Sequence, residues 1–317
     1  MARGYRLGSA ALVVAIAMVA IGCSQFGNLK AKKHFKDGSA LYQQSDWRAA
    51  AGEFEQVVAS DPNYEHIYFY LGNCYDNLYK PARKGEPEND SFLQKAIANY
   101  EKAVQTETEP SRKKLALQYL AASYGSDKLN DPNKAEPIVK QMIDMDPKDT
   151  SSYFGLAKIL EDGGKFEDAE RVLLQAKNAA PQSPEPLAQL ANFYNKRGEF
   201  DKAVLAYEEQ AKMVPNDPQV YWRLSDFYYE KVAKDYTITP KQKADYIQKG
   251  IEAADKAIGI KKDFIEAITF KNLLLRQQAR IEKDPAKQKA LLAQADDLLK
   301  QVTELQKLKQ RGVGAGA

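Results

Sequence analysis

Few residues in this sequence have the types and spacing needed for catalysis or metal binding. The 317 residues include only two histidines and two cysteines. His34 and His66 form neither an HExxH motif nor a cluster with Cys23 or Cys74. Zinc sites need three or four such ligands at short, regular spacings. The sequence therefore predicts no metal site and no framework of disulfides.

Phosphate binding and acid–base catalysis are also poorly supported. The run Gly163-Gly164-Lys165 lacks the upstream glycine and the following serine or threonine of a phosphate-binding loop. Acidic runs such as 161–162 and 167–170 fit the solvated faces of helices. We therefore expect a protein that is not an enzyme, with no cofactor and no small-molecule substrate. Two carboxylates brought together only by the fold are the alternative left open.

The segment before Cys23 is typical of a secretory signal. Residues 1–22 have Arg3 and Arg6 near their start, continue in an apolar run over 7–21 and end in Gly22. A basic start, a short apolar run and a small residue before the cleavage point are the features of such signals. A membrane-spanning helix needs about 20 apolar residues. An uncleaved anchor is the alternative to a signal peptide over 1–22.

Residues 20–23, Ala-Ile-Gly-Cys, resemble a bacterial lipobox, in which the cysteine becomes a lipidated N-terminus. Ala20 stands where leucine is commoner. The resemblance implies lipidation at Cys23, a short lipidated tether over 23–30 and anchoring in the cell envelope, where Ser24 favours the outer membrane facing the periplasm. An ordinary cysteine near a cleavage site is the alternative. Cys74 would then lack a partner, and we expect it to be buried.

Charge and composition describe an ordinary globular chain. The sequence is 44% hydrophobic and 28% charged, with a net charge of +3. Removing 1–22 takes away two of the 46 basic residues, which leaves 44 basic against 43 acidic and a net charge of +1. A nucleic-acid-binding domain carries a basic patch or stripe. We therefore expect no nucleic-acid partner.

A period of 34 residues organises the chain. Ala169 and Ala203 lie 34 residues apart, and so do Pro147, Pro181 and Pro215. A fixed period of this length indicates one helical or mixed unit repeated as a stack. Such stacks present a long binding surface rather than a single catalytic pocket.

The residues within each period resemble the tetratricopeptide repeat. The clearest copy begins at Thr150 and the next at Pro184; another begins near Ala31. The copy from Thr150 has the large, small and proline residues of the motif at Tyr153, Leu156, Ala157, Leu160, Phe166, Ala169, Leu173, Ala176 and Pro181. The resemblance implies an all-α fold, a right-handed TPR α-solenoid of about six to seven helix pairs. We place it at 31–285.

Some copies are longer than the motif. Twelve extra residues around 80–91 predict a polar loop, and about 13 around 236–243 predict another, with Thr239-Pro240 as a helix start. Such insertions map to loops, often at the binding face, and a neutral loop extension is the alternative. A last helix pair is expected at 264–281 and 286–309. The stripe 291–305 predicts a capping helix over 286–310, with a coiled-coil partner as the alternative, and 311–317 is expected to be a disordered tail.

The family resemblance also implies where ligands bind. In this family the first helix of each repeat lines a concave groove, and we expect peptide contacts from the exposed positions of these helices. Trp222 is the strongest candidate. The absence of a lysine partner for Asn73 or Asn192 disfavours a clamp for chaperone carboxylates. The predicted groove residues are Tyr42, Phe69, Asn73, Gln118, Phe154, Lys158, Asn192, Asn195, Lys196, Trp222, Asp226 and Tyr229.

The resemblance favours a bacterial TPR lipoprotein that acts as a membrane-anchored scaffold or adaptor for envelope proteins or peptides. A pilotin-like role or a role in outer-membrane assembly is a more specific alternative. A self-assembling structural protein that uses the leucine stripe of 291–305 is another.

Overall fold

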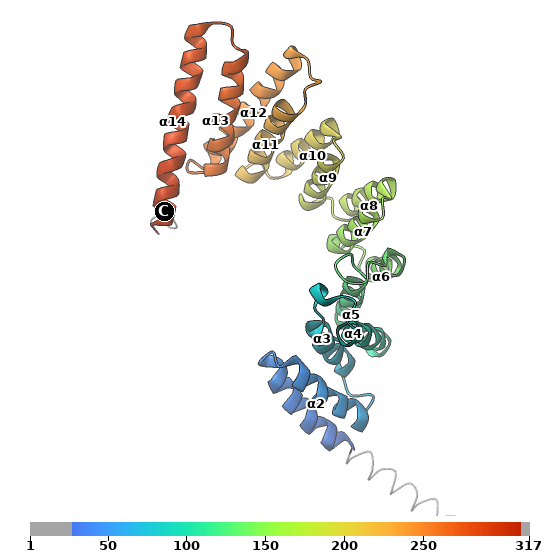
Figure 1. The fold of residues 1–317 in the computed structure, drawn as a ribbon. Coiled ribbons are helices and arrows are strands. Elements are labelled where there is room, and N and C mark those ends of the chain that lie inside the picture. The colour runs from blue at the N-terminus through green and yellow to red at the C-terminus, as the bar shows by residue number, and fades with distance from the viewer. Residues whose placement is uncertain (1–26, 312–317) are drawn as a thin grey trace, which may run out of the picture. The chain divides into compact units, whose positions relative to one another are not determined.

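The computed structural model describes residues 27–311, and their regular structure is entirely helical (Figure 1). The signal peptide expected at 1–22, Cys23 and residues 312–317 of the expected tail lie outside the described residues. The described chain divides into two compact units, one ending at Ala169 and the other beginning at Glu170. The two units are described separately below.

The N-terminal unit consists of antiparallel helix pairs joined by short turns. Residues 27–43 form its first helix. The helices that follow are α2 (Trp47–Ser60), α3 (Ile67–Leu78), α4 (Pro87–Thr106), α5 (Pro110–Ser123), α6 (Pro132–Met145) and α7 (Thr150–Asp162), with a 3₁₀ turn η1 (Pro81–Arg83) between α3 and α4. Helix α8 (Phe166–Ala179) contains the boundary between the units.

The C-terminal unit continues the same construction. Each helix packs against the next one along the chain, and α11 also contacts α13. Its helices are α9 (Glu185–Lys196), α10 (Phe200–Met213), α11 (Pro218–Lys234), α12 (Pro240–Ile260), α13 (Ile265–Ile281) and α14 (Pro285–Gln310). The last two match the helix pair expected from the sequence to within one residue at all four of their ends.

Small residues on the first helix of a pair let the second helix approach closely. A Cβ added to Gly72 would lie 2.8 Å from the Tyr100 ring, and one added to Gly38 would lie 2.7 Å from the Phe54 ring. Both rings are fully buried. Each close approach therefore depends on a glycine, because any side chain there would displace an aromatic ring from the core.

The turns within pairs also follow the sequence. Gly164 and Gly198 end their helices with φ of +72° and +71°. A left-handed residue after the last helical turn lets backbone N–H groups bond to the free carbonyls, and glycine adopts it without steric cost. Thr239 caps α12 in a capping box with Gln242, as expected for a Thr-Pro helix start.

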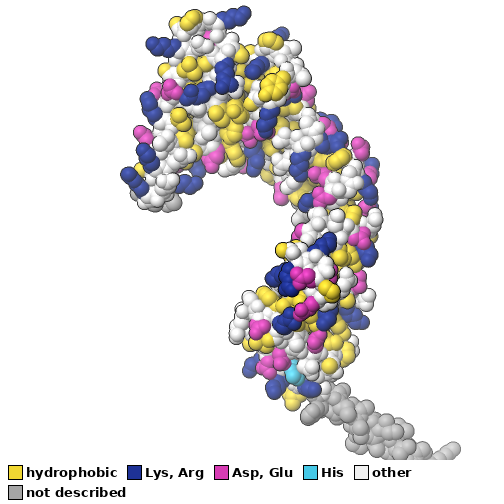
Figure 2. All heavy atoms as spheres, in the orientation of Figure 1, with side chains coloured by type: hydrophobic (Ala, Val, Ile, Leu, Met, Phe, Trp, Pro, Cys, Tyr) yellow, Lys and Arg dark blue, Asp and Glu magenta, His cyan; other side chains and the backbone are white. Residues whose placement is uncertain are grey.

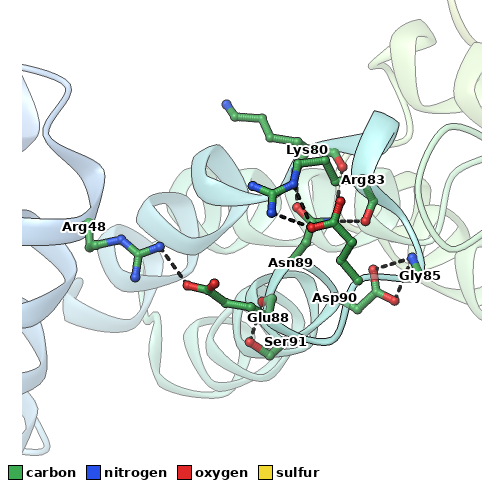
Figure 3. Close-up of polar contacts among 9 residues, drawn as sticks. Arg48, Lys80, Arg83, Gly85, Glu88, Asn89, Asp90 and Ser91 are labelled. Carbon is green, nitrogen blue, oxygen red and sulfur yellow. Dashed lines mark hydrogen bonds and ion pairs between the residues drawn. The ribbon is translucent and has the colours of Figure 1, made fainter.

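The insertion at 80–91 is ordered rather than an open polar loop. Its second half forms the first turns of α4, and Asn89 is 3% exposed. The Asn89 amide accepts a hydrogen bond from the Lys80 N–H (2.8 Å) and donates to the Lys80 and Arg83 carbonyls (both 3.1 Å), as Figure 3 shows. The Gly85 N–H bonds to the Asp90 carboxylate. Local side-chain bonds therefore satisfy the backbone of this segment.

The leucine stripe expected over 291–305 is divided between two faces of α14. Ala295 and Val302 are buried, and Leu291 and Leu298 pack with Ala295 in the cluster that α13 shares. Leu292 and Leu299 are 38% and 51% exposed. One face of α14 thus covers α13, while the other carries two leucines one heptad apart toward solvent.

Candidate functional site

In the N-terminal unit, three of the predicted groove residues lie on or beside a continuous set of aromatic rings. Ring centroids within it are 4.9–6.3 Å apart. Its edge-to-face and tilted contacts stabilise the core beyond the area they bury. Tyr42 and Phe69 are two of its members. The set comprises Phe35, Tyr42, Trp47, Phe54, Tyr64, Phe69, Tyr70, Tyr100 and Tyr119.

Asn73 is the polar centre of this aromatic set. It is 6% exposed. Its Oδ1 accepts hydrogen bonds from the Tyr42 hydroxyl (2.6 Å) and from Asn77 Nδ2 (3.0 Å). Burial raises the pKa of Tyr42 to about 12, so its hydroxyl stays a donor at neutral pH. The sequence placed Asn73 at a ligand-facing position, whereas the structure uses its amide to join the first helix to α3.

The other predicted residues of this unit are more accessible. Phe69 is half-buried, with its ring 5.4 Å from that of Tyr119. Gln118 on α5 is exposed and Phe154 on α7 is half-buried. Lys158 is exposed and pairs with Asp162 at 3.0 Å. The structure therefore brings Tyr42, Phe69 and Asn73 together but leaves those of α5 and α7 outside the aromatic set.

In the C-terminal unit, three predicted residues share one face of α11. Trp222, Asp226 and Tyr229 are spaced by four and three residues, which places them on a single stripe of the helix. All three are half-buried. The Trp222 ring contacts Phe264 at 5.9 Å, and the Tyr229 ring contacts Phe270 at 5.7 Å. The carboxylate thus lies between two aromatic pairs, one that α11 forms with Phe264 at the N-cap of α13 and one that it forms with Phe270 of α13.

This stripe has polar atoms without partners inside the protein. Trp222 Nε1 is buried and makes no hydrogen bond. The Asp226 carboxylate has none either within residues 27–311; burial, and then the nearby Glu230 carboxylate, raise its pKa to about 6. Arg223 and Lys234 oppose this shift, but the Arg223 guanidinium lies over the Trp222 ring and Lys234 bonds to Glu230. The stripe is therefore chemically unsatisfied in the free protein.

The remaining predicted residues lie on α9. Asn192 accepts a hydrogen bond from the Tyr207 hydroxyl at 2.9 Å, although its own side chain is exposed. Asn195 and Lys196 are exposed near the end of the helix. Asn192 precedes Asp226 by one period of 34 residues, so it occupies the same position on α9 that Asp226 occupies on α11. The three residues therefore form a polar surface on the corresponding face of the preceding repeat.

Sequence reasoning did not identify a cavity of about 430 Å³ in the C-terminal unit. It lies between the turn at Gly198 and the loop that joins α11 to α12. Phe200 contacts Tyr246 at 5.1 Å, and the Lys231 ammonium lies over the Phe200 ring. The insertion at 236–243 was the available signal, since this loop supplies Thr237 and Ile238 to the cavity wall.

Two further findings concern residues 27–311 alone. None of their His, Cys, Asp and Glu side chains are grouped so that they could hold a metal ion. In that same range, every helix is too short or too polar to cross a bilayer. Figure 2 shows hydrophobic side chains at the surface over α11–α14, between lysine and arginine side chains.

Comparison with known protein families identifies the repeats. Tetratricopeptide repeat models match residues 35–81, 128–193 and 187–221. The matched segments include residues of both units. The fold is a tetratricopeptide-repeat solenoid. No curated protein matches the sequence.

One of three similar solved structures supports this fold. The C-terminal part of a TPR repeat-containing protein from Cytophaga hutchinsonii is 15% identical, with a TM-score of 0.57, over 83% of this chain and 95% of that one. A tetratricopeptide repeat protein from Parabacteroides merdae is 13% identical, with a TM-score of 0.47, over 84% and 99%. The protein MamA is 22% identical, with a TM-score of 0.41, over 58% and 93%. At 15% identity, the likeness to the Cytophaga hutchinsonii structure concerns the fold alone.

Proposed function

We propose that this protein is a scaffold that binds extended segments of other proteins along the first helices of its repeats. The unsatisfied stripe on α11 is the observation that carries the proposal. Aromatic side chains that stay half-exposed beside unpaired polar atoms supply contact area and hydrogen bonds at a binding surface. Solenoids of helix pairs form such extended surfaces from the same helix of each successive repeat.

The location of the scaffold is a separate part of the proposal. The lipobox-like residues 20–23 support attachment to a membrane of the bacterial cell envelope through acyl chains on Cys23. Two or more such chains anchor a protein stably, whereas one gives only marginal binding. The partners would then be envelope proteins, with the outer membrane as the proposed site. Replacing Cys23 with serine should release the protein from membranes, and an unchanged location and mature mass would contradict lipidation.

Binding through α11 can be tested with a matched pair of surface variants. Trp222→Ala removes the half-buried indole of the stripe, and Leu205→Ala removes a side chain on α10 that is 64% exposed. We expect Trp222→Ala to lose most partners recovered from solubilised envelopes by the wild-type protein, while Leu205→Ala retains them. Equal recovery by all three proteins would contradict the assignment of the binding surface to α11.

A second candidate function rests on α14. Leu292 and Leu299 form an exposed apolar pair that could join two copies, as in the self-assembly alternative. Size-exclusion chromatography with light scattering should then give a dimer that Leu299→Lys converts to a monomer. A wild-type monomer at high concentration would count against this candidate.

A further inference from the structure

The stripe on α11 has a charge that narrows the kind of segment it can bind. Asp226 is its only ionisable member apart from Tyr229, and it lies one helical turn from each aromatic residue. Its carboxylate is half removed from water yet receives no hydrogen bond from residues 27–311. A carboxylate in that condition gains more from a charged donor than from water, because part of its hydration has already been lost.

The cations already near Asp226 do not neutralise it. Arg223 lies three residues away, but its guanidinium carbon is 5.2 Å above the Trp222 ring and its side chain is exposed. The Lys234 ammonium bonds to Glu230 at 2.5 Å. Glu230 itself adds negative charge beside Asp226 and makes the position less favourable for an acidic ligand.

The aromatic pairs on either side favour a cation flanked by apolar groups. Trp222, packed on the buried Phe264, and Tyr229, packed on Phe270, place half-buried rings at the two ends of the stripe. Rings of this kind attract cations through their faces and pack against the methylene groups of arginine and lysine. Arginine suits the position better than lysine, because its planar group can both stack on a ring and pair with a carboxylate.

The length of the stripe sets the spacing of the bound residues. Seven residues of helix separate Trp222 from Tyr229, which is about 10 Å along the axis. An extended segment advances about 3.3 Å per residue, so about three steps, which join about four residues, would cover this distance.

We propose that α11 is a selectivity site for a basic residue, at which Asp226 accepts hydrogen bonds from an arginine or lysine of the bound segment. The aromatic pairs at Trp222 and Tyr229 hold apolar residues on either side of it. This inference rests on the proposed scaffold function and adds the chemical class of the segment. It predicts an apolar–basic–apolar pattern over about four residues.

The test is selection from a phage-displayed library of random seven-residue peptides on the immobilised full chain. Wild type should enrich peptides with arginine or lysine between apolar residues. Asp226→Asn should lose the basic preference, and Asp226→Lys should shift it toward acidic residues. Asp297→Asn removes the same charge at an exposed position of the same unit and should select as wild type does. Far-UV circular dichroism confirms that each variant is folded.

Affinity measurements then separate this inference from the scaffold function. Replacing the selected arginine with citrulline, which is neutral and nearly the same shape, should weaken binding at least about tenfold to wild type, as expected for a lost charge-assisted hydrogen bond. It should have little effect with Asp226→Asn. Enriched peptides without a basic preference, or with affinity unaffected by Asp226→Asn, would overturn the selectivity site alone. Enrichment of no peptide at all would overturn the scaffold function as well.

Discussion

The two units use the same helix face in opposite ways. In the N-terminal unit, Asn73 bonds to Tyr42 and Asn77 within a continuous set of aromatic rings. In the C-terminal unit, Trp222 and Asp226 lie between aromatic pairs without polar partners. Equivalent positions of the repeat thus carry paired polar groups in one unit and polar groups without a hydrogen bond in the other. Motif position alone does not tell these two uses apart.

The difference follows from what surrounds each position. Tyr42, Tyr70 and Tyr119 crowd the first helices of the N-terminal unit, so polar side chains there are enclosed by neighbouring repeats. Beside Trp222 and Tyr229 on α11, the neighbouring rings are those of Phe264 and Phe270. A polar group enclosed by its own fold must be paired there, whereas one at an open face can be paired by a partner protein.

The largest loss of stability is expected from a substitution in the aromatic set of the N-terminal unit. Phe54→Ala should lower the free energy of unfolding by about 3–5 kcal/mol, because Phe54 is fully buried between Gly38 and neighbouring rings. Phe270→Ala, at a half-buried ring of the open stripe, should cost less than half as much. Urea denaturation followed by circular dichroism measures both values. Similar losses of stability for the two variants would contradict the difference between the buried aromatic set of the N-terminal unit and the half-buried stripe on α11.

Two asparagines at the same repeat position give a matched comparison. Asn73→Ala leaves the half-buried Tyr42 hydroxyl without its acceptor, removes one of the two bonds of Asn77 Nδ2, and should cost about 1–3 kcal/mol. Asn192→Ala removes one bond, from Tyr207, at an exposed site and should cost about 1 kcal/mol or less. If Asn192→Ala were as destabilising as Asn73→Ala, this helix face in the C-terminal unit would contribute as much to stability as the enclosed face of the N-terminal unit.

Two aspartates should respond to pH with opposite signs. Burial raises the pKa of Asp226 to about 6, so its contribution to stability is complete below about pH 4 and is lost as pH rises from about 4 to 6. Asp226→Asn should therefore stabilise the protein at pH 7. A pKa raised by about two units corresponds to roughly 2.7 kcal/mol. Because the side chain is half-exposed and solvent screens its charge, we expect a gain of about 1 kcal/mol. Urea titrations at pH 4 and pH 7 provide the measurement.

Asp149 in the N-terminal unit is the counterpart. Burial acts to raise its pKa, but hydrogen bonds from Ser151, Lys114 and Ser152 outweigh burial and hold the pKa well below its usual value. Its contribution is present above about pH 4 and is lost as pH falls through the lowered pKa. Asp149→Asn should destabilise at pH 7 and have less effect at pH 3. If both substitutions changed the free energy of unfolding at pH 7 in the same direction, the environments described for the two aspartates would be contradicted.

The smallest effect is expected at Lys158, which precedes Asn192 by one period. It is exposed and makes an ion pair with Asp162, four residues away on the same helix. Pairs of this type contribute about 0.2–0.5 kcal/mol, so Lys158→Ala should change stability by no more than that. A larger decrease in the free energy of unfolding, measured by urea denaturation, would indicate that Lys158 makes a buried polar contact on α7.

Much of the fold could be predicted from local chemistry. The spacing of Ala169 and Ala203, the turns at Gly164 and Gly198, and the start of α12 after Thr239 each depend on residues within one helix pair. The insertion at 80–91 was predicted less well, because its order depends on the bonds of Asn89 to a turn nine residues away. The outward turn of Leu292 and Leu299 depends on which face of α14 meets α13.

The candidate site was predicted only as a list of positions. The sequence alone determined the repeat, its period and the helix faces, since these follow from the rotation per residue of a helix and from glycine and proline at fixed places. Tertiary structure decided that Asn73 is enclosed and that Asp226 is not. That distinction depends on neighbours from other repeats, whose side chains set burial and hydrogen bonding, and a pattern within one repeat carries no information about them.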